Sequence, residues 1–331
     1  MSQAPYLSYS RMKTLEGCSW LYWCKYGLKL PDTTNDGALR GLICHLVFEL
    51  LLDSKHKKHH EIISKHKTIE ASKAVQKLVE KQLKKFDILD QENYDLVNEM
   101  IVVGIRNDFY VDGAELLDPE FEFDITNEDP YYRIYGFIDK AAKFKAKKEI
   151  LISDYKSSKQ KFKGEELESN VQAMIYSLVA KKTWPKLKPI VEFIFLRFPR
   201  KPIQRLEFND DTLKGFEYYL GEVYKRVRNF NQNDAESNFA ADKPIPKEGF
   251  SGKLLCGFAK YHGQLKKDGS VMWHCPYKFS FSYYALKDKD GKILKTNFKN
   301  AFTPKKGERV EKMEYDGCPR HKSQDILDSF A

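Results

Sequence analysis

The chain has 331 residues, of which 42% are hydrophobic, so it is long enough to bury the core of one large domain or two ordinary ones. Its 56 Lys and Arg against 47 Asp and Glu give a net charge of +9, which fits a nucleic-acid partner and fits a lysine-rich solubilising surface equally well. No apolar run approaches the roughly 18 residues of a membrane span, and no secretion signal is recognisable, so we expect a soluble cytoplasmic protein without membrane contact.

The first part of the chain is predicted to be helical. Ser8 suits the N-cap position of an aromatic-rich helix over residues 8–26. After a loop at residues 32–37, the spacing of leucines indicates a helix over residues 38–52. The lysine-rich segment 54–115 keeps helical spacing, which predicts an insert of two or three helices.

The middle of the chain is predicted to mix strands and helices. Aromatic and β-branched residues with a period of two predict strands over residues 121–125, 131–144 and 150–157. An apolar stripe predicts a helix over residues 165–182, followed by a strand over 189–198 and a helix over 210–230. These elements together predict an α/β domain.

The composition changes from about residue 242, where Pro and Gly become frequent. We therefore expect a main domain over residues 1–240 and a Cys-containing extension over residues 241–331. The chain has six scattered cysteines, and disulfides are not expected among them in a reducing cytoplasm. Buried thiols and metal ligands remain as the two alternatives.

The strand over residues 150–157 carries the first chemical signal. Because side chains alternate along a strand, Ile152, Asp154 and Lys156 share one face. A carboxylate and an ammonium group at the end of an apolar face are costly to bury without a purpose. The alternative is a local ion pair where the strand leaves the core, and a D-x-K pattern alone does not decide between them.

A second carboxylate is predicted to face the first across a hairpin. The preceding strand contains Gly136-Phe-Ile-Asp139, and if Ala146 and Lys147 form the turn, Asp139 lies directly opposite Asp154. Opposed carboxylates repel each other unless a cation lies between them. Oxygen ligands of this kind suit Mg²⁺ or Mn²⁺.

Two helices offer further candidate groups. His45 and Glu49 are four residues apart and share a helical face, where they could bind metal or orient a water molecule. Gln172 and Tyr176 have the same spacing and could contact a phosphate group or a base. The alternatives are a core histidine with a surface glutamate, and the edge of an amphipathic helix.

Taken in order, these four patterns resemble the RecB-like branch of the PD-(D/E)XK nuclease superfamily, which includes the nuclease domains of helicase-nucleases and CRISPR-adaptation exonucleases. The resemblance covers residues 6–200 and runs through Gly41/His45/Glu49, Gly136/Asp139, Asp154/Lys156 and Gln172/Tyr176. It implies a restriction-endonuclease-like core, in which helices flank a mixed sheet. A helical insert and the Cys-containing C-terminal extension complete the expected architecture.

The resemblance also implies roles for individual residues. Asp139 and Asp154 correspond to the metal-binding acids, and His45 corresponds to an additional metal ligand. Glu49 is the less certain ligand. Lys156 corresponds to the residue that positions the attacking water and stabilises developing charge. Gln172 and Tyr176 correspond to residues that support the catalytic site or contact DNA.

Some members of this branch hold a 4Fe-4S cluster with four cysteines, one before the core and three closely spaced beyond it. Cys18 fits the first position, and the extension offers Cys256, Cys275 and Cys318, which are 19 and 43 residues apart rather than closely spaced. An iron–sulfur cluster, a zinc site that includes a histidine of the extension, and a site without metal all stay open.

The resemblance implies a metal-dependent DNA exonuclease of a bacterial or phage-infected cell, acting in DNA repair, recombination or phage DNA processing. The expected partners are single-stranded or end-containing DNA, a helicase or recombination protein, and further copies of the chain. One alternative is a non-catalytic or structure-specific nucleic-acid-binding protein that keeps the fold. Another is a nuclease that acts on RNA or branched DNA.

Overall fold

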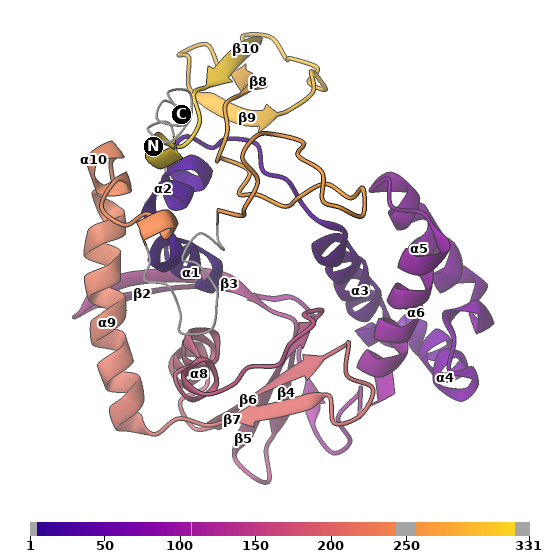
Figure 1. Ribbon diagram of the computed structural model, residues 1–331. Coiled ribbons are helices and arrows are strands. Elements are labelled where there is room, and N and C mark those ends of the chain that lie inside the picture. Colours follow the sequence, from indigo (N-terminus) through magenta and orange to yellow (C-terminus); the bar gives the residue numbers. More distant parts are fainter. Residues whose placement is uncertain (1–4, 107, 243–255, 322–331) are drawn as a thin grey trace. The chain divides into compact units, whose positions relative to one another are not determined.

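The chain forms two compact units. The computed structural model describes residues 5–106, 108–242 and 256–321 (Figure 1). The first unit comprises Met1–Tyr9 and Thr34–Lys225, and the second comprises Ser10–Thr33 and Arg226–Ala331. A boundary near residue 240 was expected, with all earlier residues in the main domain. The structure instead groups residues 10–33 with the C-terminal part of the chain.

A five-stranded mixed sheet is the centre of the first unit. Its strand order is β1-β4-β5-β6-β7, and the pair β5–β6 is parallel while the other pairs are antiparallel. The strands are β1 (Glu115–Leu116), β4 (Lys140–Phe144), β5 (Glu149–Lys156), β6 (Lys188–Phe195) and β7 (Ile203–Leu206). β5 is nearly continuous in buried side chains, as expected for a central strand with both faces covered.

The predicted strand over residues 131–144 is wrong in one respect, because it is two strands. β3 (Tyr131–Ile138) pairs with β2 (Phe121–Glu128) in a separate two-stranded sheet, whereas β4 pairs with β5. Asp139 lies at the break between β3 and β4. The break lets one continuous stretch of chain serve two hairpins, with Asp139 at their junction.

Helices cover both faces of the central sheet. The predicted helical insert is confirmed as three helices, which follow α3 (Asp36–Leu52): α4 (Lys57–His66), α5 (Lys73–Lys85) and α6 (Gln91–Arg106). Apolar side chains of these helices pack in one cluster with Tyr155 and Ile194 of the sheet and with Leu196, which directly follows β6. α8 (Val171–Thr183) covers the other face of the sheet (Figure 1), where its Gln172 bonds to the side chain of Asp154. The predicted mixed α/β fold with flanking helices is therefore confirmed.

The predicted helix over residues 165–182 is interrupted. A short helix, α7 (Glu165–Glu168), ends before Asn170, which has an extended backbone and caps α8. The Asn170 side chain accepts a hydrogen bond from the backbone N–H of Ala173 at 3.0 Å. This cap fixes where α8 begins, and Gln172 is its second residue. The remaining long helix of this part is α9 (Asp210–Arg228).

The second unit joins the amino-terminal helices to the C-terminal part of the chain. The predicted helix over residues 8–26 is broken into α1 (Tyr9–Gly17), α2 (Ser19–Tyr22) and a π-helical turn (Trp23–Gly27), because Cys18 is extended. Ser19 donates a hydrogen bond to the carbonyl of Ala235 in α10 (Gln232–Ala235) at 2.8 Å. Trp20 donates one to the hydroxyl of Tyr315 at 2.8 Å.

A three-stranded antiparallel sheet completes the second unit. Its order is β10-β8-β9, formed by β8 (Phe281–Lys287), β9 (Ile293–Asn297) and β10 (Arg309–Tyr315). Its core is aromatic and includes Tyr277, Tyr283 and Tyr315 together with Cys18 and Cys256. Across the described residues of both units, no helix combines the length and apolar character that crossing a membrane requires.

Candidate active site

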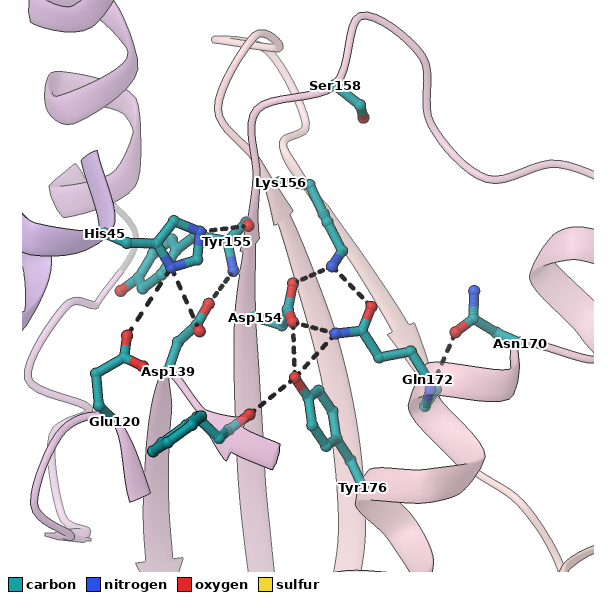
Figure 2. A network of polar contacts seen from close by, with 12 residues as sticks. His45, Glu120, Asp139, Asp154, Tyr155, Lys156, Ser158, Asn170, Gln172 and Tyr176 are labelled. Carbon is teal, nitrogen blue, oxygen red and sulfur yellow. Dashed lines mark hydrogen bonds and ion pairs between the residues drawn. The ribbon is translucent and has the colours of Figure 1, made fainter. Parts of the chain in front are cut away.

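β5 presents an acid and a base on one face of the central sheet. Asp154 is 3% exposed, and its Oδ1 lies 2.6 Å from the Nζ of Lys156. Nζ also donates a hydrogen bond to Oε1 of Gln172 at 2.7 Å, so the ammonium group is held by two partners (Figure 2). The structure therefore places the two charged residues of the D-x-K pattern in direct contact, on the face that the strand alternation predicts.

α8 supplies two side chains that hold Asp154 from the other side. Gln172 donates a hydrogen bond to Oδ2 of Asp154 at 2.6 Å, and Tyr176 donates one to the same oxygen at 2.9 Å. The two α8 side chains also bond to each other at 2.9 Å (Figure 2). Both oxygens of Asp154 therefore have a fixed orientation, and the network links β5 to the first turns of α8.

A close approach between Gly136 and Phe123 of neighbouring strands positions the aromatic ring that packs against Tyr176. Gly136 lies directly opposite Phe123, and a Cβ at Gly136 would be 2.8 Å from the Phe123 ring. The Phe123 ring in turn packs edge-on against the ring of Tyr176, with centroids 6.4 Å apart. Glycine at position 136 therefore makes room for the aromatic ring against which Tyr176 rests.

Three carboxylates, those of Glu120, Asp139 and Asp154, lie near one another where the two hairpins meet. The β4–β5 register ends with Lys140 opposite Ser153, as the turn at Ala146 and Lys147 predicts, and Asp139 and Asp154 are the next residues of the two segments. The β2–β3 register pairs Phe121 with Ile138, which continues to Glu120 opposite Asp139 on the other side. The backbone N–H of Glu120 bonds to the carbonyl of Asp139 at 3.3 Å. Like charges in neighbouring positions destabilise a sheet unless a cation compensates them.

α3 brings His45 to the same carboxylates. Its Nδ1 lies 3.4 Å from Oδ1 of Asp139 and 4.0 Å from Oε1 of Glu120, and its Nε2 lies 3.1 Å from the carbonyl oxygen of Tyr155. The other oxygen of Asp139 accepts a hydrogen bond from the N–H of Tyr155 at 2.8 Å. Figure 2 shows these side chains converging from α3, the β1–β2 connection and the sheet.

A glycine one turn before His45 allows this approach. A Cβ at Gly41 would lie 2.7 Å from the hydroxyl and 3.3 Å from the Cβ of Ser157, the residue that follows Lys156. Glycine therefore lets α3 pack closely against the end of β5. The G-x-x-x-H pattern has a structural explanation, since the small residue positions the helix and the histidine four residues later reaches the acids.

The electrostatics of the site are dominated by buried negative charge. Burial disfavours the charged form of His45, but its hydrogen bond to Asp139 and the charges of the acids outweigh this and raise its pKa to about 9. Burial, with the charge of Asp139, raises the pKa of Glu120 above its ordinary value. Burial also raises the pKa of Asp154, although Lys156 opposes the shift. A site that favours an imidazolium this strongly also favours a metal cation.

His45, Glu120 and Asp139 form the one group of potential ligands that meets the spacing of a metal site among the described residues. One ligand atom from each lies within 4.8 Å of the others. Glu120 was not among the residues singled out from the sequence. Glu49 is exposed and does not belong to this group. One nitrogen and carboxylate oxygens form a donor set that suits Mg²⁺ or Mn²⁺.

The second unit contains the four cysteines that the family resemblance suggests as ligands of an iron–sulfur cluster. Cys18, Cys256, Cys275 and Cys318 line one small cavity, to which His321 also contributes. Burial raises the pKa of the Cys275 and Cys318 thiols to about 12. No three of the described cysteine and histidine side chains here bring their ligand atoms within 4.8 Å of one another.

The comparisons with known proteins cover most of the chain. The family model described as the PD-(D/E)XK nuclease superfamily matches residues 6–246. A solved structure from Eubacterium rectale, named "Putative exonuclease", resembles the chain with a TM-score of 0.43 and 14% sequence identity, covering 73% of this chain and 91% of its own. No curated protein matches the chain.

Proposed function

The chain belongs to the PD-(D/E)XK nuclease superfamily, and from this premise we propose that it is a divalent-metal-dependent DNA exonuclease of the RecB-like branch. The reaction is hydrolysis of phosphodiester bonds, in DNA repair, recombination or phage DNA processing. We assign the catalytic roles to Asp139, Asp154, Lys156, Gln172 and Tyr176.

One arrangement carries this proposal. The metal-ligand group of His45, Glu120 and Asp139 lies at the same end of the sheet as the Asp154–Lys156 pair (Figure 2). Hydrolysis of a phosphodiester requires an activated water molecule and compensation of the negative charge that develops on the phosphate. A bound divalent cation supplies both.

The protein's own groups then have separate tasks. The Lys156 ammonium group, held at 2.6 Å from Asp154 and 2.7 Å from Gln172, is a fixed positive charge that can orient water and stabilise the phosphate oxygens. Gln172 and Tyr176 both donate to Oδ2 of Asp154 and so fix its position, which makes them positioning residues as well as candidates for DNA contact. Asp139 orients His45 and holds the peptide of Tyr155.

The nuclease proposal is tested by digestion of end-labelled linear DNA and covalently closed circular DNA, both single- and double-stranded, with RNA of the same sequence alongside. We expect metal-dependent loss of linear DNA while closed circles survive, because an exonuclease needs an end. Cutting of closed circles would instead identify an endonuclease. Preferential cutting of RNA would overturn the assignment of DNA as substrate.

Two glutamates compete for the third ligand position, and a matched pair of variants separates them. We expect Glu120→Gln to weaken the binding of Mn²⁺ by roughly tenfold or more, because the neutral amide removes a charged ligand atom near His45 and Asp139. Glu49→Gln, which changes the exposed glutamate on α3, should leave the affinity unchanged. Isothermal titration of each purified variant with Mn²⁺ measures both effects.

The opposite result would restore the assignment made from the sequence. If Glu49→Gln weakens Mn²⁺ binding while Glu120→Gln does not, Glu49 is the ligand and the α3 face controls the site. Equal affinities for wild type and both variants would place the cation elsewhere.

We propose that Cys18, Cys256, Cys275 and Cys318 hold a 4Fe-4S cluster. Their convergence on one cavity supports a shared ligand. A tetrahedral zinc site would bring its thiolates to about 3.8 Å from one another, given Zn–S bonds of about 2.3 Å. No three of the described cysteine sulfurs lie within 4.8 Å of one another, so their spacing is not that of a closed zinc site. Of the two metal groups, we propose the larger 4Fe-4S cluster. Such a group would stabilise the fold of the second unit.

Metal analysis of anaerobically purified protein tests this assignment. We expect iron and acid-labile sulfide in the wild type and loss of both in Cys275→Ala, with a lower melting temperature. Cys44→Ala is the matched control, since Cys44 is fully buried in the helices of the first unit. Zinc in place of iron, or equal iron in the Cys275 variant, would contradict the assignment.

The remaining expectations about partners and location are proposals of the same kind. Single-stranded or end-containing DNA, a helicase or recombination protein and further copies of the chain are the partners we propose. No disulfide joins any of the cysteines that the structure describes, which is compatible with a reducing compartment such as the cytoplasm.

A further inference from the structure

A hairpin in the second unit exposes an unusual number of large apolar side chains. Of the fifteen large hydrophobic residues that are exposed in the described part of the chain, five fall within residues 258–273. They are Phe258, Tyr261, Leu265, Val271 and Trp273, each more than half exposed. Scattered apolar residues on a surface need no explanation, whereas such a concentration marks an interaction site.

The hairpin has a defined structure. Isolated antiparallel bridges pair Gly257 with His274 and Leu265 with Val271. The N–H of Met272 donates to the carbonyl of Gln264 at 2.7 Å, and the N–H of Lys266 donates to the carbonyl of Ser270 at 2.8 Å. The exposed side chains are therefore presented by a hydrogen-bonded scaffold, which lowers the entropy cost of binding through them.

The base of the hairpin is tied to the cysteine cavity. The N–H of Cys275 donates to the carbonyl of Cys256 at 3.0 Å, so the two strands begin and end at residues that line the cavity. Lys278 donates to the carbonyls of Gly257 and Ala259 at 3.1 and 2.6 Å. Gly257 has a φ of +69°, and a Cβ there would lie 2.2 Å from the carbonyl oxygen of Trp273. These contacts fix the direction in which the hairpin projects.

The charge of this region is complementary to a polyanion. Residues 256–321 contain fourteen Lys and Arg and seven Asp and Glu, so they carry +7 of the chain's total charge of +9. Within the hairpin, Lys260, Lys266 and Lys267 are exposed between the aromatic residues. Its one acidic residue, Asp268, accepts hydrogen bonds from the N–H and the hydroxyl of Ser270. Aromatic and basic side chains that alternate in this way fit bases and phosphates at once.

We propose that the hairpin of residues 256–275 binds single-stranded nucleic acid, with unpaired bases stacking on its exposed aromatic rings and phosphates contacting its lysines. The proposal deepens the proposed nuclease function and rests on it for the identity of the polyanion. In a duplex the faces of the bases are covered by their neighbours, so an aromatic platform selects unpaired strands. A protein partner would not require the surplus of lysines, and that charge favours nucleic acid.

Binding of a fluorescently labelled oligothymidylate to the full chain, in buffer without divalent metal so that no cleavage occurs, tests the proposal. We expect Trp273→Leu to weaken binding by roughly 5- to 100-fold, and Trp273→Phe to restore most of it, because phenylalanine stacks and leucine only fills space. Tyr261→Ala should also weaken binding. Tyr218→Ala is the matched control, since Tyr218 is 66% exposed and Tyr261 is 62% exposed.

Two further readouts make the result decisive. Replacing Lys266 and Lys267 by alanine should lower the salt dependence of binding, because fewer counterions are released. Duplex DNA and anionic phospholipid vesicles are the competitors, and we expect neither to displace the oligonucleotide at equal phosphate concentration. Wild-type affinity in Trp273→Leu, restoration absent in Trp273→Phe, or preferential binding of duplex or vesicles would overturn the proposal.

Failure here is distinguishable from failure of the nuclease assignment. Metal-dependent cleavage that disappears in an Asp154 variant, together with unaffected oligonucleotide binding in Trp273→Leu, would support the nuclease assignment and refute the role of the hairpin. Binding that depends on Trp273 in a chain that cuts no substrate would support the role of the hairpin and refute the nuclease assignment. Melting temperatures of all variants exclude unfolding as the cause.

Discussion

Replacement of Lys156 by methionine is expected to lower the rate of phosphodiester cleavage by about 10² to 10³-fold while leaving metal affinity unchanged. The ammonium group is held by Asp154 and Gln172, so its position is fixed before substrate binds. A fixed charge stabilises the developing charge without reorganisation, and methionine fills the same space without that charge. Single-turnover cleavage of labelled linear DNA measures the rate, and titration with Mn²⁺ measures the affinity.

A second lysine provides the control for this variant. Lys182 has a side chain that is 31% exposed, compared with 21% for Lys156, and it contacts Glu217 and Asn127 rather than the carboxylates of the site. Lys182→Met should therefore cleave at the wild-type rate. A Lys156→Met variant that is folded and cleaves as fast as the wild type would show that the charge of Lys156 has no part in the reaction.

The second large effect is expected for Asp154→Asn. Asparagine keeps the shape of the side chain, but it removes the negative charge that pairs with Lys156 and it can accept hydrogen bonds through only one oxygen. We expect cleavage to fall by about 10² to 10³-fold, because both the lysine and the α8 side chains lose their common partner. Single-turnover measurements at saturating enzyme separate this loss of cleavage rate from weaker substrate binding.

Glu192 is a matched control for a buried carboxylate in the same sheet. Like Asp154 it is 3% exposed, but it bonds to Ser153 and Arg205 on the opposite face. Glu192→Gln is expected to lower the melting temperature and to leave the cleavage rate of the folded protein unchanged. If both variants lose activity to the same extent, the effect of Asp154→Asn comes from the stability of the sheet rather than from the site.

The local patterns of the sequence predicted the geometry around β5 well. Alternation along the strand placed Asp154 and Lys156 on one face, and a two-residue turn predicted the β4–β5 register, in which Lys140 pairs with Ser153. Both inferences depend only on the fixed period of a strand and on the length of one turn. Interactions between residues close in sequence are the part of a fold that periodicity determines.

Glu120 was missed because it lies in no periodic segment. It belongs to the irregular connection between β1 and β2 and has a positive φ of +52°. The signal that could have found it is the register of the neighbouring hairpin, since Phe121 pairs with Ile138 and the next pair outward is Glu120 with Asp139. Treating residues 131–144 as one strand hid this, because a single strand cannot change partners at Asp139.

Local patterns also could not predict which segments of the chain form the second unit. Ser19 and Trp20 contact Ala235 and Tyr315, more than 200 residues away in the sequence. Such contacts depend on packing and hydrogen bonds between distant segments, and the hydrophobic periodicity of the sequence does not reveal them. The cysteines are the one available signal, since the family resemblance groups Cys18 with those of the extension, and all four line one cavity.

The measurement that tests the central claim most directly is the cleavage of end-labelled linear DNA by the wild type in Mg²⁺, Mn²⁺ and EDTA, beside Asp139→Asn. Asp139 contacts His45, Glu120 and the peptide of Tyr155, so every part of the proposed metal site depends on it. We predict cleavage with either metal, none with EDTA, and a loss of at least about a hundredfold in the variant. Cleavage in EDTA, or wild-type rates in folded Asp139→Asn, would contradict the account.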